Sequence, residues 1–209
     1  MTRKRIIISA VSLLMISMLC VIAIRPVRHG VRTAVTTIAA RMSPAADAQF
    51  PAIDSSKLTE QQLDIITLAR QEYQNHPVSY DQNVLKYTGG NKEAWCADFI
   101  SWVMIKTGNS YKNPNSGSWR IPGVYTLQEF YKAQKKYVGT EMYGPKVGDV
   151  AFYIGRHTFD IFSTEHVSLV VAVNGDMMTT IGGNEGGKLR LDTQRISADS
   201  NSLVGFGRL

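Results

Sequence analysis

The chain has 209 residues, of which 44% are hydrophobic, and a formal net charge of +6. Residues 1–50 hold seven Lys or Arg and one acid, Asp47, whereas residues 51–209 hold 16 of each sign. The positive excess therefore lies in the N-terminal part, and the remainder offers no basic surface for a polyphosphate. We expect no nucleic-acid partner. The length fits one globular domain with appendages.

An uncharged apolar run covers residues 6–24 and ends at Arg25-Pro26. As a helix rising about 1.5 Å per residue, this run nearly spans a hydrocarbon core of ~30 Å. It predicts one transmembrane helix, with residues 1–25 as an anchor in the cell membrane and the following domain outside the cell. A cleaved signal sequence and a secreted protein are the alternative, although a signal usually has a shorter apolar core. Residues 26–56 are then a linker, and the globular domain covers residues 57–209.

Three helices are expected in the first half of this domain. Residues 59–62, Thr-Glu-Gln-Gln, form a capping box that begins a helix over residues 59–75. A second helix begins near Trp95-Cys96 and ends at Gly108, and a third is signalled by a capping box at residues 126–129. The segment 109–123 is rich in Asn, Ser, Gly and Pro and is predicted to be a surface loop. Its aromatic residues are candidates for one wall of a substrate groove: Tyr111, Trp119 and the nearby Tyr125.

After Gly148 the sequence changes to short runs of β-branched and aromatic residues, at 149–154, 166–173, 177–181 and 203–207. Asn174-Gly175-Asp176 lies between two of these runs and predicts a hairpin. Helices followed by strands are typical of an α+β domain in which the N-terminal helices pack on an antiparallel sheet.

Cys96 stands at the expected start of the second helix. Unpaired backbone N–H groups and the helix dipole favour an anion there, so they favour the thiolate and could stabilise an oxyanion. The other cysteine, Cys20, lies in the apolar run and could pair with Cys96 only by leaving the bilayer. Cys96 is therefore a candidate nucleophile, and the alternative is a small buried hydrophobic residue.

His166 and Asn184 are candidates for the other two catalytic roles. His166 enters an apolar strand that would hold its imidazole rigidly, as a general base requires. Asn184 lies in the glycine-rich segment 181–187 and is expected to accept a hydrogen bond from the His166 ring. A structural histidine and a plain loop are the alternatives. We expect neither metal nor cofactor, because one cysteine and one distant histidine fall short of a zinc site.

Together these segments resemble the CHAP family, the cysteine-, histidine-dependent amidohydrolase/peptidase domains, over nearly all of residues 58–209. The matching segments are, in order, Trp95-Cys96-Ala97-Asp98-Phe99, Pro145-Lys146-Val147-Gly148-Asp149-Val150, Glu165-His166-Val167 and Ile181-Gly182-Gly183-Asn184. The resemblance implies a papain-like α+β fold and hydrolysis of amide bonds in the stem peptides or cross-bridges of peptidoglycan. It also implies Cys96 as nucleophile, His166 as base and Asn184 as the orienting residue.

The chain departs from this pattern at Gly182, where many relatives carry an acid two residues before the asparagine. Glu185 is close in sequence, but a turn at the end of a strand leaves the direction of its side chain open. The third role is therefore assigned to Asn184, with Glu185 as a candidate helper.

Two other functions stay open. A related NlpC-type cell-wall peptidase usually places a second histidine in the third role, so Asn184 favours the CHAP family. A catalytically silent wall-binding module would need none of the three residues. Amidase action between sugar and stem and endopeptidase action within the peptides use the same triad, so the sequence does not distinguish them.

Overall fold

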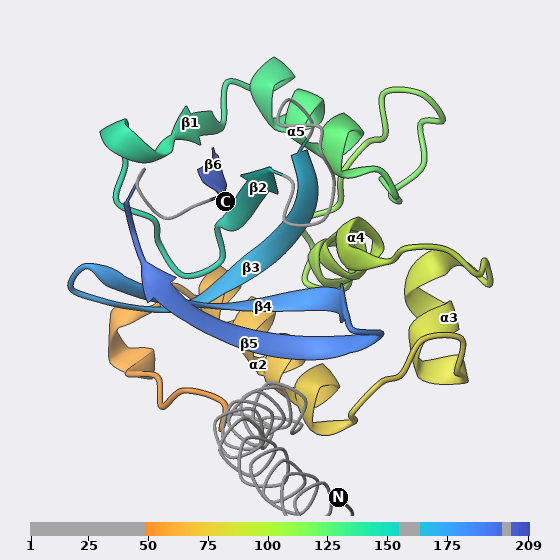
Figure 1. Cartoon of the computed structure of the whole chain (residues 1–209), viewed down its shortest axis with the longest axis horizontal. Coiled ribbons are helices and arrows are strands. Elements are labelled where there is room, and N and C mark those ends of the chain that lie inside the picture. The colour runs from red at the N-terminus through yellow and green to blue at the C-terminus, as the bar shows by residue number, and fades with distance from the viewer. Residues whose placement is uncertain (1–48, 155–163, 198–201) are drawn as a thin grey trace, which may run out of the picture. The chain divides into compact units, whose positions relative to one another are not determined.

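The structure, a computed structural model, describes residues 49–154, 164–197 and 202–209 (Figure 1). The predicted anchor at residues 1–25 and most of the predicted linker lie outside the described residues. Within the described ranges, no helix combines the length and the apolar character needed to cross a membrane. The membrane anchor therefore stays a prediction.

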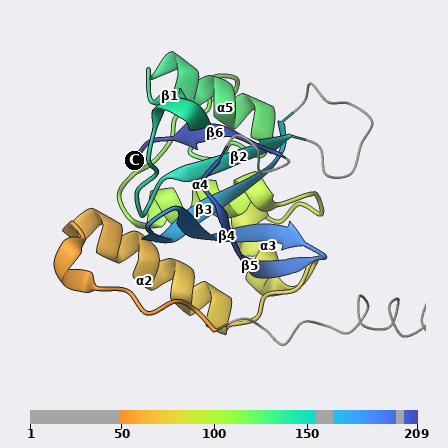
Figure 2. The same ribbon diagram turned by 60° about the vertical axis from the view of Figure 1, so that its left-hand side comes forward.

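The described residues form an α+β domain, as predicted, in which four α-helices pack on a six-stranded sheet (Figures 1 and 2). All neighbouring strands are antiparallel, in the order β1-β6-β2-β3-β4-β5. The strands are β1 Tyr137–Gly139, β2 Val150–Ile154, β3 Thr164–Asn174, β4 Met177–Glu185, β5 Lys188–Arg195 and β6 Leu203–Gly207. The predicted hairpin joins β3 to β4 through Gly175, whose φ is +60°.

The helices are α2 Glu60–Gln74, α3 Gln82–Thr88, α4 Cys96–Lys106 and α5 Val124–Ala133. The capping box that predicts α2 is confirmed, because Thr59 and Gln62 exchange side-chain hydrogen bonds with each other's backbone N–H groups. Two short 3₁₀ turns, η1 Ser55–Lys57 and η2 Thr140–Met142, complete the regular elements of the described residues. The packed part of the chain begins before the predicted domain start at residue 57. Phe50 packs its ring on Tyr73 of α2, with 6.0 Å between the ring centroids.

Alternation along the strands divides the sheet residues between two hydrophobic clusters. In β2, Val150 and Phe152 belong to the main cluster with residues of α2, α4 and α5, whereas Ala151 and Tyr153 belong to a second cluster. Tyr153 pairs with His166 of β3. Because directly paired residues share a face, the His166 side chain lies on the face of the second cluster.

Some sequence expectations about these elements were wrong. The capping box expected at residues 126–129 is absent, because α5 begins earlier, at Val124, with Gly123 as an N-cap that makes no side-chain hydrogen bond. The buried apolar residues Val124, Leu127 and Tyr131 extend the packing face of this helix into that earlier turn. Helix α3 and strands β1 and β5 were not predicted, and β4 continues past residue 181 to Glu185.

Candidate active site

Cys96 is the first residue of α4, as predicted, and carries a free thiol in a side chain that is 7% exposed. The preceding residue, Trp95, is the N-cap and supplies no side-chain hydrogen bond to the first turn. The first-turn N–H groups of α4 therefore have no side-chain cap, and the positive end of the helix dipole lies beside the sulfur. This environment favours an anion at the thiol position.

Trp95 fixes the backbone in front of Cys96. Its side chain is fully buried, and its indole N–H donates a hydrogen bond to the hydroxyl of Ser79 across 2.9 Å. The ring of Tyr87, from α3, packs against the indole with 5.7 Å between centroids. The start of α4 is thus held by contacts with two segments that precede it in the chain.

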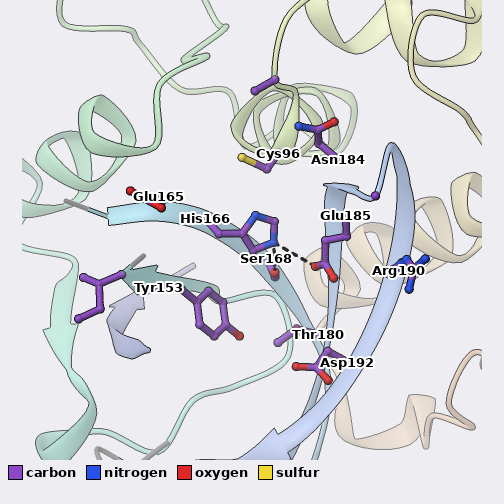
Figure 3. A pocket seen from close by; sticks show the side chains of 13 residues that line it. Cys96, Tyr153, Glu165, His166, Ser168, Thr180, Asn184, Glu185, Arg190 and Asp192 are labelled. Atoms are coloured by element: carbon purple, nitrogen blue, oxygen red, sulfur yellow. Dashed lines mark hydrogen bonds and ion pairs between the residues drawn. The ribbon is translucent and has the colours of Figure 1, made fainter. Parts of the chain in front are cut away.

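His166 lies near the start of β3, with its imidazole between Cys96 and Glu185 (Figure 3). Its Nε2 atom is 3.0 Å from Oε1 of Glu185 and 3.2 Å from Oγ of Ser168. The Cys96 thiol is close enough to this ring to raise its pKa. Because Nε2 contacts Glu185 and Ser168, Nδ1 is the ring nitrogen that remains to face Cys96. The contacts of Nε2 fix the orientation of the ring.

Burial of the His166 ring lowers its pKa, but its neighbours raise the pKa by more. The interactions of the ring with Cys96 and Glu185, including the charges on these two groups, bring its pKa to about 9 from an ordinary value of 6.5. A positive imidazolium is therefore favoured near neutral pH, beside a sulfur and a carboxylate that both stabilise it.

The hydrogen bond expected between His166 and Asn184 is absent among the described residues. The Asn184 Oδ1 atom instead accepts a hydrogen bond from the Ser79 hydroxyl across 3.4 Å, and the same hydroxyl accepts one from Trp95. Glu185, expected only as a helper, makes the contact with the imidazole. The physical reason is an irregularity in the pairing of β4 with β5 between Gly182 and Glu185, which changes the direction of the side chains after residue 182.

A cleft of about 560 Å³ brings the four candidate residues Cys96, His166, Asn184 and Glu185 together. Beyond the carboxylate of Glu185 its wall continues along β4 and β5. Figure 3 shows polar side chains on this wall and around the ring, namely Tyr153, Glu165, Ser168, Thr180, Arg190 and Asp192. The cleft is large enough to take a peptide segment beside the thiol.

The aromatic wall that was expected from the loop at 109–123 does not border this cleft. Tyr111 is buried, and its hydroxyl lies 2.6 Å from that of Tyr131 in α5. Trp119 packs against the main cluster, and Tyr125 is 64% exposed but does not line the cleft. The aromatic residues of the loop therefore attach it to the domain, since their apolar surfaces are more favourable in the core than in water.

Arg120 connects the same loop to the nucleophile segment. Its Nη1 atom lies 2.8 Å from Oδ1 of Asp98 and also binds the carboxylate of Glu93. Asp98, in the first turn of α4, is fully buried, and its Oδ2 atom has no hydrogen-bond partner. Burial raises the pKa of Asp98, and although Arg120 opposes this shift, the pKa reaches about 6. Asp98 thus connects the first turn of α4 to the loop at 109–123 through Arg120.

Ser168, Ser79 and Arg120 were not identified from the sequence. Ser168 stands two residues after His166 on the same strand face, so alternation alone could have indicated it. Ser79 and Arg120 come from irregular segments that reach the site only through the tertiary fold, and no local pattern marks them. Within the described ranges, no group of three His, Cys, Asp or Glu side chains could hold a metal ion.

Comparison with known proteins shows which family model the segment around this site matches. Residues 87–184 match the model of the CHAP domain. Over this segment the chain is similar to a CHAP domain. The matched segment begins in α3 and ends at Asn184, so it includes Cys96 and His166 but stops one residue before Glu185.

No curated protein matches the chain. Among solved structures, the crystal structure of Ly7917 is similar, with a TM-score of 0.46 and 14% sequence identity. The similarity covers 71% of this chain and 62% of that one. A CHAP domain suggests hydrolysis of peptidoglycan amide bonds as an amidase or a peptidase, and such domains typically depend on a cysteine and a histidine.

Proposed function

We propose that this protein is a peptidoglycan hydrolase that cleaves amide bonds through a thioester acyl-enzyme on Cys96. It would act as an N-acetylmuramoyl-L-alanine amidase or as a peptide endopeptidase on stem peptides or cross-bridges. One observation carries the proposal: an uncapped helix start presents Cys96 to an imidazole whose pKa is raised to about 9, inside a cleft. A thiol, a base and open space for a substrate are thus together.

In the acylation step, His166 takes the proton of the Cys96 thiol, or the two rest as a thiolate–imidazolium pair. The sulfur attacks the amide carbonyl carbon and forms a C–S bond, while the carbonyl π electrons move to the oxygen. The backbone N–H of Cys96 and the positive end of α4 stabilise this oxyanion. When the intermediate collapses, the C–N bond breaks and the His166 imidazolium protonates the leaving amine.

In the deacylation step, His166 removes a proton from water, and the resulting hydroxide attacks the thioester carbonyl. The C–S bond breaks, the product leaves as a carboxylic acid, and the thiolate of Cys96 is restored beside the imidazolium. Glu185 accepts the hydrogen bond from Nε2 throughout, which fixes the ring orientation and stabilises its positive form. We assign this orienting role to Glu185 rather than Asn184 because of that contact.

The site of action proposed for the enzyme is outside the cell membrane. The apolar run at residues 6–24 would anchor the chain as a single-pass protein, or it would be a cleaved signal for secretion. Both arrangements bring the domain to the cell wall, where its substrate lies.

The test uses the whole chain in mild detergent on purified peptidoglycan, beside Cys96→Ala, Cys96→Ser and His166→Ala. The native chain is expected to release fragments that mass spectrometry assigns to one type of amide bond, and the three variants are expected to be inactive. Cys20→Ser is the control, since it removes the other thiol and should keep full activity. If Cys96→Ala released the same fragments at a similar rate, the nucleophile would be wrong. Binding to peptidoglycan with no release by the native chain would identify a wall-binding module instead.

A further inference from the structure

Strand β4 contains one more residue than its neighbour β5 in the segment beside the imidazole. Gly182 pairs with Arg190, and Glu185 pairs with Lys188. Two residues of β4 therefore stand between these pairs, whereas β5 has one. This arrangement is a β-bulge, which bends the strand and changes the direction of the side chains that follow it.

The bulge determines where Glu185 points. In a regular strand, residues 182 and 185 would lie on opposite faces, because side chains alternate. Here their partners in β5 are two positions apart and so share one face, which places Gly182 and Glu185 on that same face. Gly182 also pairs with Ser168 of β3, two residues after His166. The bulge therefore brings the Glu185 carboxylate to the face that carries the imidazole.

The absence of a side chain at residue 182 leaves the space that this carboxylate occupies. A Cβ atom on Gly182 would overlap with Oε1 of Glu185. It would also lie 2.8 Å from Nε2 of His166 and 2.8 Å from Oγ of Ser168. Even an alanine at this position would thus push the carboxylate away from the ring. Gly182 thus makes room for an acid that comes three residues later.

Asn184 supplies the unusual backbone conformation inside the bulge. Its φ is +61°, in the left-handed region that asparagine adopts more readily than most other residues with a side chain. Its side chain accepts a hydrogen bond from Ser79, which in turn accepts one from Trp95, the residue before Cys96. The side chain of Asn184 therefore connects the bulge to the nucleophile helix and not to the imidazole.

We propose that this bulge places the orienting carboxylate of Glu185 beside the His166 ring, with Gly182 making the room and Asn184 holding the backbone. Gly182 and Asn184 act through Glu185, and Glu185 acts through His166, so all three are positioning residues. The first test of this inference measures peptidoglycan cleavage, so it rests on the proposed function. Its second readout, the pKa of His166 measured by NMR, reports the contact with Glu185 whether or not a substrate is cleaved.

The central test is a double-mutant cycle on the whole chain with Gly182→Ala, Glu185→Ala and the double variant. Each single substitution is expected to lower kcat/KM on peptidoglycan by on the order of 10²-fold, the contribution typical of positioned acid–base groups. Each should also lower the pKa of His166, whose signal is assigned by its loss in His166→Gln. The double variant should be more active than the product of the two single effects predicts, because the carboxylate that the methyl group displaces is already gone and only its contacts with His166 and Ser168 remain. Independent effects that multiply in the double variant would overturn the proposal.

Two substitutions at Asn184 test the backbone role. Asn184→Gly keeps access to a positive φ but loses the hydrogen bond with Ser79, so it should lose less activity than Asn184→Ala and leave the pKa of His166 unchanged. Asn184→Ala disfavours that φ and should lower both quantities in the same direction as Glu185→Ala. Equal losses in the two variants would show that the amide group itself matters, and the assigned role would be wrong.

Three further outcomes separate failure of this inference from failure of the proposed function. Full activity in Cys96→Ala would reject the function, while the NMR titration would still test the bulge. An inactive Cys96→Ala together with a Gly182→Ala variant of native activity and native His166 pKa would reject the inference alone. If one of these variants does not fold, Glu185→Gln takes its place, because it keeps the size of the side chain. An unchanged pKa of His166 in Glu185→Gln would also reject the inference.

Discussion

The imidazole of His166 and the carboxylate of Glu185 are in direct contact, with 3.0 Å between Nε2 and Oε1. Interactions with Cys96 and Glu185 raise the pKa of the His166 ring to about 9. Because the imidazolium must give a proton to the leaving amine, kcat/KM is expected to fall as the pH rises through about 9. Initial rates of fragment release, measured from neutral to alkaline pH, give this alkaline limb of the pH profile. In Glu185→Gln the limb should move to lower pH, since one group that raises the pKa has lost its charge.

The same pKa makes the stability of the fold dependent on pH. The pKa of His166 in the folded protein, about 9, exceeds its ordinary value of 6.5. The contacts of the imidazolium should therefore stabilise the fold fully below pH 6.5, and this contribution should disappear as the pH rises through about 9. Urea unfolding of the native chain and of His166→Ala at several pH values measures this contribution to stability. The free-energy difference between the two proteins should shrink with rising pH, and a difference that grows instead would contradict the assignment.

The elements that the sequence predicted correctly depend on local signals. The capping box at Thr59 and the apolar spacing after Cys96 act within one or two helical turns, and both helices begin where these signals stand. Helix α3 has comparable local signals: Asp81 caps its start, and Gly89 ends it in a left-handed conformation. Strand β5 was missed because many of its residues are polar and only partly covered, which gives a weak apolar pattern.

The identity of the third residue of the site could not be read from the sequence. Alternation assigns a side chain to one face of a strand only if the pairing is regular, and one extra residue in β4 reverses it between Gly182 and Glu185. The glycine-rich segment predicted a turn near residue 184, but the turn between β4 and β5 is Gly186-Gly187, where both φ values are positive. Nucleophile and base stand on regular elements, which explains why their positions were easier to predict.

Ser79→Ala is expected to destabilise the fold and to lower activity through Trp95. The fully buried indole N–H would lose its acceptor, at a cost of roughly 1–3 kcal/mol for an unsatisfied buried donor. Since Trp95 immediately precedes Cys96, kcat should fall as well. Urea unfolding and peptidoglycan assays measure the two effects. Ser116→Ala is the matched control, because its exposed hydroxyl bonds only within its own turn, and it should change neither quantity.

Arg120→Ala should be among the most destabilising single substitutions in the domain. Arg120 is the ion-pair partner of the fully buried Asp98, and removal of one member of a buried pair costs roughly 3–5 kcal/mol. Asp98→Asn removes the other charge, so the double variant Asp98→Asn with Arg120→Ala should recover part of the loss. The four proteins of this cycle are compared by urea unfolding at neutral pH.

Lys132→Ala supplies the contrast for that cycle. The pair of Lys132 with Glu129 has a similar N–O distance of 2.8 Å, but its side chains are 46% and 44% exposed. Water screens such a pair, so its loss should cost no more than about 1 kcal/mol. If Arg120→Ala were as mild as Lys132→Ala, the loop at 109–123 would not depend on Arg120 for its attachment to α4. If the double variant were no more stable than Arg120→Ala, the unpaired charge of Asp98 would not be the cause of the loss.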